Sequence, residues 1–149
     1  MSNVAKRINI VSIKMVKESS FLYQIRQILS PNDAYEMIKE QLDGLDREQF
    51  IIACLNTKNE PTNISVVSVG SLNKAIVHPR EVFKTAILSN AASIMAFHNH
   101  PSGETTPSQQ DIQLTNRLYE AGELLGIKLL DHLIIGDGTF TSLKEKGYL

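Results

Sequence analysis

Cysteine, proline and glycine are scarce in this chain. Its 149 residues include one cysteine, 5 prolines and 8 glycines, which excludes disulfide-stapled miniproteins, collagen-like chains and disordered low-complexity segments. The cysteine, Cys54, lies in an apolar run over residues 50–55, and we interpret it as a thiol of the core. Without a second cysteine, neither an intrachain disulfide nor a zinc site of several cysteines can form.

An excess of charge of one sign and long apolar runs are also missing. Fifteen Lys and Arg against 16 Asp and Glu give a net charge of -1 at pH 7, so the basic excess that usually supports DNA binding is absent. Association with DNA through a local basic patch is still compatible with this net charge. No run approaches the ~20 apolar residues that cross a bilayer. The N-terminus also lacks the apolar core of a signal peptide. We therefore expect a cytoplasmic protein without a membrane partner.

The remaining composition is that of a folded protein, with 42% hydrophobic and 21% charged residues. At ~150 residues per domain, the length predicts one domain with its own core. We divide the chain into an N-terminal strand or extension over residues 1–29 and a globular domain over residues 30–149. Within the extension, residues 6–17 roughly alternate polar and apolar side chains, which predicts a strand.

Helices and strands are predicted to alternate along the globular domain. Prolines near helix starts, apolar residues at helical spacing and closing glycines predict helices over 31–43, from Pro79 onward, and from a capping box at Thr106-Pro107-Ser108-Gln109 to about Gly126. Short apolar runs between turn residues predict strands over 50–56, 64–69, 92–97, 129–135 and 140–143. The expected buried stripe of the middle helix consists of Val82, Phe83, Ala86 and Ile87. This alternation predicts an α/β fold with a mixed sheet covered by helices.

Metal-binding side chains are concentrated between His98 and Asp111. On an extended backbone His98 and His100 project to the same side, with Cα atoms roughly 6.5–7 Å apart, whereas Asn99 points away. Ser108 and Asp111 share one face of the first turns of a helix. An isolated His-x-His pair is more often structural, but this set predicts that two imidazoles and a carboxylate converge on one ion.

Three protein ligands leave the fourth position of zinc open, which is typical of catalytic rather than structural sites. Zinc lowers the pKa of a bound water to about 7 and so supplies hydroxide at neutral pH. Ser108, at a helix N-terminus, is expected to donate a hydrogen bond to an oxyanion, a contact worth ~3 kcal/mol. Glu48, just before a strand, is the leading candidate for the proton acceptor, and the local sequence leaves Glu40, Glu60 and Glu81 open as alternatives.

The complete pattern resembles the JAMM motif of the JAB/MPN zinc metalloprotease superfamily. It consists of Glu48, His98-x-His100, seven intervening residues, Ser108, two further residues and Asp111. Over about residues 30–149 the sequence resembles the RadC branch of this superfamily. The segments that carry this resemblance are Val77-His78-Pro79-Arg80-Glu81, His98-Asn99-His100-Pro101-Ser102-Gly103, Pro107-Ser108-x-x-Asp111, Asp131-His132 and Ser142-Leu143-Lys144-Glu145-Lys146-Gly147.

The resemblance implies a JAMM/MPN-type α/β fold, a mixed sheet flanked by helices that is similar in plan to cytidine deaminases. It implies that Zn²⁺ is bound by His98, His100 and Asp111, with Glu48 as general acid/base and Ser108 as oxyanion support. The implied reaction is zinc-dependent hydrolysis of an amide in a peptide or protein substrate, such as a peptide or isopeptide bond. Asn99 stands where the protease branches usually carry Ser or Thr, which bears on substrate preference.

Other functions are compatible with parts of this pattern. Full-length RadC proteins also carry an N-terminal helix-hairpin-helix region for which this chain is expected to be too short, so a DNA repair role has little support from the resemblance. A non-catalytic accessory in DNA repair or mobile-element DNA processing is nevertheless the main alternative. Two histidines and a carboxylate also suit an iron oxygenase, whereas a zinc nucleobase deaminase would need cysteine ligands that are missing.

Overall fold

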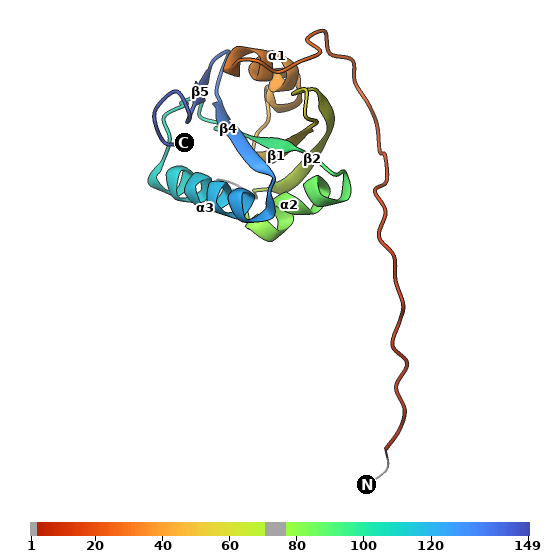
Figure 1. Cartoon of the computed structure of the whole chain (residues 1–149). Coiled ribbons are helices and arrows are strands. Elements are labelled where there is room, and N and C mark those ends of the chain that lie inside the picture. Colours follow the sequence, from red (N-terminus) through yellow and green to blue (C-terminus); the bar gives the residue numbers. More distant parts are fainter. Residues whose placement is uncertain (1–2, 71–76) are drawn as a thin grey trace.

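The computed structural model describes residues 3–70 and 77–149. A five-stranded sheet lies between α1 on one face and α2 with α3 on the other (Figure 1). The elements follow one another as α1 (Pro31–Leu42), β1 (Gln49–Leu55), β2 (Pro61–Val69), α2 (Pro79–Leu88), β3 (Ser93–Asn99), α3 (Gln109–Leu125), β4 (Lys128–Ile135) and β5 (Phe140–Ser142). The predicted α/β class is confirmed, and the helix and strand boundaries differ from the predicted ones by a few residues.

The strands are ordered β2-β1-β3-β4-β5 in a mixed sheet. β3 and β4 are parallel, and the other neighbouring pairs are antiparallel. Parallel neighbours need a crossover connection. Here a loop follows the end of β3, and α3 then carries the chain back over the sheet to the start of β4. The carboxyl end of β3 therefore lies beside the first turn of α3, a position where α/β sheets commonly bind ligands.

Both faces of the central strands are buried. β1 and β3 are covered by helices on both sides, which explains why their sequences are continuous apolar runs instead of alternating ones. We call the two sides the α1 face and the α2/α3 face. Cys54 lies in the core of the α2/α3 face, as predicted, and burial raises the pKa of its thiol.

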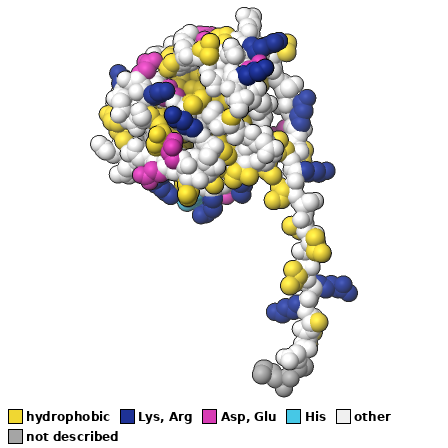
Figure 2. Space-filling view, in the orientation of Figure 1, with side chains coloured by type: hydrophobic (Ala, Val, Ile, Leu, Met, Phe, Trp, Pro, Cys, Tyr) yellow, Lys and Arg dark blue, Asp and Glu magenta, His cyan; other side chains and the backbone are white. Residues whose placement is uncertain are grey.

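The predicted strand over residues 6–17 is wrong. These residues extend away from the globular domain, and Ile8 and Ile10 are 90% and 101% exposed. Figure 2 shows hydrophobic and Lys or Arg side chains projecting along this segment. A strand requires hydrogen bonds to a neighbouring strand, and none of the strand pairs among the described residues includes this segment.

Two details of the helices also differ from the prediction. α3 begins two residues later than the Thr106 capping box implied, because Ser108 and Asp111 form the capping box instead. In α2, Val82, Phe83 and Ala86 are buried as predicted, but Ile87 is 53% exposed. It lies five positions after Val82, which places it about 140° away around the helix, off the buried stripe. No helix in the described ranges combines the length and hydrophobicity needed to cross a membrane.

Candidate metal centre

The sheet topology brings four of the predicted site residues to one place. His98 is the penultimate residue of β3, His100 follows the strand directly, and Asp111 lies in the first turn of α3. Because β1 runs antiparallel to β3, with Phe50 opposite His98, Glu48 enters the same corner just before β1 starts. All four come from the ends of secondary-structure elements that the fold holds side by side.

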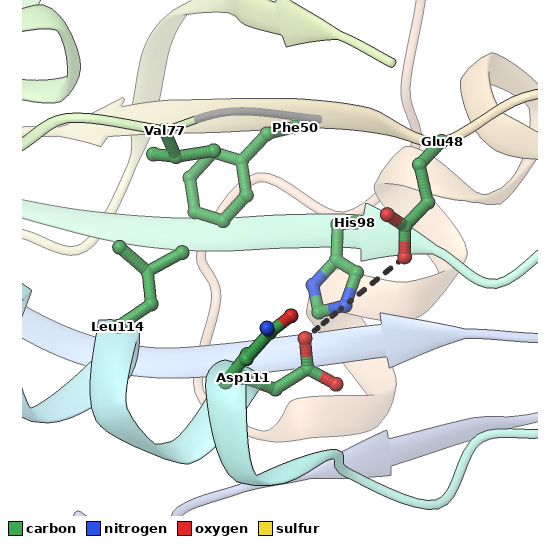
Figure 3. A pocket seen from close by; sticks show the side chains of 7 residues that line it. Glu48, Phe50, Val77, His98, Asp111 and Leu114 are labelled. Atoms are coloured by element: carbon green, nitrogen blue, oxygen red, sulfur yellow. Dashed lines mark ion pairs between the residues drawn. The ribbon is translucent and has the colours of Figure 1, made fainter. Parts of the chain in front are cut away.

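The side chains of these residues approach one another closely. The Nε2 atoms of His98 and His100 are 3.0 Å apart. Asp111 reaches both imidazoles, with Oδ1 at 3.3 Å from His98 Nε2 and Oδ2 at 3.2 Å from His100 Nε2. Glu48 Oε1 lies 4.0 and 3.6 Å from the same two nitrogens. In Figure 3, Glu48 and Asp111 point toward His98 from opposite sides.

The surroundings of His100 leave its Nε2 available to a metal. Its Nδ1 lies 2.7 Å from the backbone carbonyl oxygen of Glu104, and a carbonyl can only accept a hydrogen bond. His100 therefore carries a proton on Nδ1. In the neutral imidazole the lone pair is then on Nε2, the atom that faces Asp111 and Glu48, as a metal ligand requires.

The charges of this cluster call for a positive partner. Burial alone would raise the pKa of the Asp111 carboxyl, but the neighbouring imidazoles of His100 and His98 and a hydrogen bond from the backbone N–H of Ser108 hold it well below its usual range. The hydrogen bond to Asp111 in turn raises the pKa of His100, against the opposing effect of burial. Converging imidazoles and carboxylates that favour a bound proton also provide the nitrogen and oxygen donors that zinc prefers.

Several of these residues are able to hold an ion. Glu48, His98 and His100 offer ligand atoms that all lie within 4.8 Å of one another, and Asp111 lies next to both imidazoles. The division of roles in which Asp111 is the third ligand and Glu48 is the general base stays a prediction. The donor set nevertheless fits the zinc that the sequence suggested.

Asn99 positions the backbone that carries Glu48. Its Oδ1 accepts a hydrogen bond from the N–H of Gln49 at 2.8 Å, and its Nδ2 donates to the carbonyl oxygen of Arg47 at 3.0 Å. Asn99 is 4% exposed and points away from the imidazoles, as the alternation along a strand predicts. It thus holds the residues on both sides of Glu48, a contact that the sequence pattern did not reveal because it joins positions about 50 residues apart.

Ser108 has a structural role at the start of α3. Its Oγ accepts a hydrogen bond from the N–H of Asp111 at 3.1 Å, and its own N–H donates to Asp111 Oδ2 at 2.8 Å. This reciprocal pair fixes the Asp111 carboxylate in front of the imidazoles. The Ser108 hydroxyl proton is not used in this contact, so its predicted interaction with an oxyanion stays a prediction.

A pocket opens next to the cluster. Glu48, His98 and Asp111 form its polar wall, and the other lining residues are Phe50, Val77, Gln110 and Leu114. Figure 3 shows Phe50, Val77 and Leu114 gathered on one side of His98. The pocket therefore joins an apolar wall to the polar cluster.

Two further histidines were noted in the sequence. His78 occupies the N-cap position of α2, is exposed, and makes no side-chain capping hydrogen bond. His132 is fully buried in β4, and burial together with the neighbouring His98 holds its pKa well below the usual range. Its Nε2 lies 2.7 Å from His98 Nδ1, and its Nδ1 lies 2.7 Å from Thr115 Oγ1. In the sequence, His132 stood out only as part of the Asp131-His132 segment of the RadC resemblance, and no pattern pointed to Thr115.

Comparison with known proteins identifies the family. A family model described as the RadC-like JAB domain matches residues 28–148. The chain belongs to the RadC-like JAB domain family. The resemblance seen in the motif is therefore confirmed, and the five-stranded mixed sheet with three helices is consistent with a JAB-domain fold.

Relatives of this RadC-like JAB domain occur in bacteria and archaea. The UPF0758 protein YsxA of Bacillus subtilis (strain 168) is 52% identical over 136 residues, which cover 91% of this chain and 57% of that protein. A UPF0758 protein of Moorella thermoacetica is 57% identical over 122 residues, or 82% of this chain and 53% of that protein. UPF0758 protein Mbar_A2303 of Methanosarcina barkeri is 48% identical over 124 residues, or 83% and 54%. The chain thus spans about half the length of these relatives.

Proposed function

We propose that this RadC-like JAB domain is a cytoplasmic, zinc-dependent hydrolase of amide bonds in a peptide or protein substrate. One observation carries the proposal: two imidazole nitrogens 3.0 Å apart face a carboxylate of the first turn of α3 on one side and Glu48 on the other. This arrangement fits a divalent ion with a position left for a reactant, and family membership supports the same reading.

Each residue has a distinct role in the proposed reaction. His98, His100 and Asp111 would hold the zinc ion, which when bound supplies Lewis acidity and an acidified water. Glu48 would take a proton from the attacking water and deliver it to the leaving nitrogen, because it lies at the edge of the cluster and lines the pocket. The Ser108 hydroxyl would donate to the oxygen that becomes negative.

The pocket suggests which part of the substrate lies beside the reacting bond. Its wall away from Glu48 and Asp111 is formed by Phe50, Val77 and Leu114. An apolar side chain next to the scissile bond would bury its surface there, whereas a charged one would lose hydration without a partner. The preferred substrates would therefore have an apolar residue next to the cleaved amide.

The test is a zinc-loaded protein screened against libraries of peptides and isopeptide-linked peptides. We expect about one equivalent of bound zinc, and cleavage that is lost in Glu48→Gln while zinc is still bound. A folded protein that takes up no zinc would exclude the proposal. Binding of iron with oxygen consumption in place of zinc would favour an oxygenase instead.

A non-catalytic accessory in DNA processing is the second candidate, and one observation favours it. The N-terminal extension exposes five basic side chains, from Lys6, Arg7, Lys14, Lys17 and Arg26, against one acidic side chain, from Glu18. Such a segment can contact phosphates even though the whole chain is nearly neutral. DNA binding that weakens with salt and is unchanged in Glu48→Gln, together with no cleavage of any peptide, would favour this function.

A further inference from the structure

Two buried side chains form a chain of hydrogen bonds behind His98. His132 and Thr115 are both 0% exposed, and neither belongs to the metal-ligand motif. His98 Nδ1 lies 2.7 Å from His132 Nε2, and His132 Nδ1 lies 2.7 Å from Thr115 Oγ1. We propose that His132 and Thr115 are positioning residues that hold His98 in the tautomer whose Nε2 can bind a metal. This inference rests on the metal site proposed above.

The direction of each hydrogen bond follows from the last acceptor in the chain. Thr115 Oγ1 lies 2.8 Å from the backbone carbonyl oxygen of Asp111, which can only accept. Because a hydroxyl has one proton, Thr115 donates to this carbonyl and accepts from His132. His132 therefore carries its proton on Nδ1. As a neutral imidazole in a dry environment it accepts at Nε2 from the Nδ1–H of His98.

This order determines which nitrogen of His98 is free to bind an ion. With the proton of the neutral ring on Nδ1, the lone pair is on Nε2, the atom 3.0 Å from His100 Nε2 and 3.3 Å from Asp111 Oδ1. The other tautomer would place an N–H between the ligand atoms and would leave Nδ1 and His132 Nε2 without a proton to share. The hydrogen-bonded chain thus selects the metal-binding form before an ion arrives.

The chain of hydrogen bonds also joins three secondary-structure elements, α3, β4 and β3. It begins at the carbonyl of Asp111 on α3, passes through His132 on β4 and ends at His98 on β3. The Asp111 carboxylate and His98 would then share the same ion, so the connections form a closed loop. Phe50 packs edge-on against His132 with ring centroids 5.3 Å apart, which shields the loop from water and strengthens its hydrogen bonds.

The first test measures zinc affinity by competition with a chromophoric chelator. His132→Phe keeps the ring volume but removes the acceptor, and we expect zinc to bind about 10- to 100-fold more weakly. His132→Gln should recover most of this loss, because its Oε1 can accept from His98 Nδ1–H. Thr115→Val should weaken binding by a smaller factor, since His132 would lose only the partner that fixes its own proton.

A matched control separates positioning from stability. Leu118 is 0% exposed on α3, one turn after Thr115, and Leu118→Ala should destabilise the fold while zinc affinity stays that of the wild type. If affinity instead follows stability across Leu118→Ala, His132→Phe and Thr115→Val alike, the residues only pack and the inference is overturned. It is also overturned if His132→Phe binds zinc as tightly as the wild type.

The second test needs no variant and remains informative if a substituted protein fails to fold. Nitrogen-15 NMR of the zinc-loaded wild type should show protonated Nδ1 and metal-bound Nε2 for His98, and a neutral His132 protonated on Nδ1. The opposite tautomer of either ring would overturn the inference while zinc binding, and with it the proposed function, stood. A wild type that bound no zinc would instead overturn the proposed metal site itself.

Discussion

The two faces of the sheet are built from the same strands but have different contents. On the α1 face, the cluster consists of hydrophobic side chains from α1, from the strands and from Ile28 just before α1, and it includes Ile38 and Phe97. The α2/α3 face is equally apolar in its middle, where Leu118 packs on the sheet. At the carboxyl end of β3 and on the neighbouring β4, however, this face carries the buried imidazoles of His98 and His132.

The difference separates stability from chemistry within one small domain. Burying apolar surface favours folding by ~25 cal/mol per Å², whereas each buried imidazole or carboxylate needs a partner to offset its lost hydration. The polar groups of the α2/α3 face meet this requirement by bonding to one another, as His98 does with His132 and Asp111. The α1 face can therefore supply packing while the other face supplies the site. Four predictions test this division.

The largest expected effect is on the metal. His100→Ala should lower zinc affinity by about 1000-fold, or ~4 kcal/mol, because one of the proposed ligands is lost while the fold is kept. Zinc content after dialysis and the thermal midpoint of the metal-free protein are the measurements. His78→Ala is the matched control, since His78 is exposed on α2, and it should retain full zinc binding. Equal zinc content in both variants would contradict the site.

The second prediction concerns the α1 face. Ile38 is 0% exposed, and Ile38→Ala should reduce the free energy of unfolding by ~3 kcal/mol through lost burial and a cavity. Urea unfolding measures this loss. Zinc stoichiometry of the folded fraction should be unchanged, because Ile38 contacts the opposite side of the sheet. A proportional loss of zinc would show that the two faces are not separable.

The third prediction concerns the residue that holds the Glu48 backbone. Asn99→Ala would leave the N–H of Gln49 and the carbonyl of Arg47 without their side-chain partner, and should cost about 1–3 kcal/mol of stability. Asn116→Ala, at an exposed position of α3, should change stability by less than ~0.5 kcal/mol. If urea unfolding gave the same result for both, the Asn99 hydrogen bonds would have no net energetic role.

The smallest expected effect is a gradual change of zinc affinity with pH. The hydrogen bond to Asp111 raises the pKa of His100 above 6.5, while burial opposes it. Below that raised pKa, zinc must displace the proton, so apparent affinity should fall by about tenfold per pH unit and level off above it. In metal-free protein the sign is opposite: the stabilisation is complete below pH 6.5 and is lost as pH rises through the raised pKa. Affinity that stayed flat in acid would refute this coupling.

The sequence predicted those parts of the molecule whose signals are local. Helix and strand patterns and the spacing of His98, His100 and Asp111 placed the elements and the corner where they meet. The partnership of Asn99 with residues before β1 could not be read in the same way, because it depends on strand pairing across about 50 residues. The strand predicted over residues 6–17 was wrong for a related reason. Its alternation of polar and apolar side chains is typical of a strand, but a local pattern does not show whether a neighbouring strand is there to pair with it.

The start of α3 shows how two local signals can compete. Thr106 and Gln109 fit a capping box, but so do Ser108 and Asp111, and the second pair makes both reciprocal hydrogen bonds. Asp111 is also drawn toward the imidazoles, a long-range contribution that the local pattern omits. Thr115 was missed altogether, since a threonine within an amphipathic helix has no distinguishing pattern until its partner on β4 is known.

The acceptors behind the two histidines differ in how they tolerate genetic change. The proton on His100 Nδ1 rests on a main-chain carbonyl at position 104, which survives replacement of that side chain. The proton on His98 Nδ1 is instead accepted by the imidazole of His132, which a single substitution can remove. Neutral drift can therefore vary the side chain at position 104, whereas position 132 is restricted to side chains that can accept a hydrogen bond from His98.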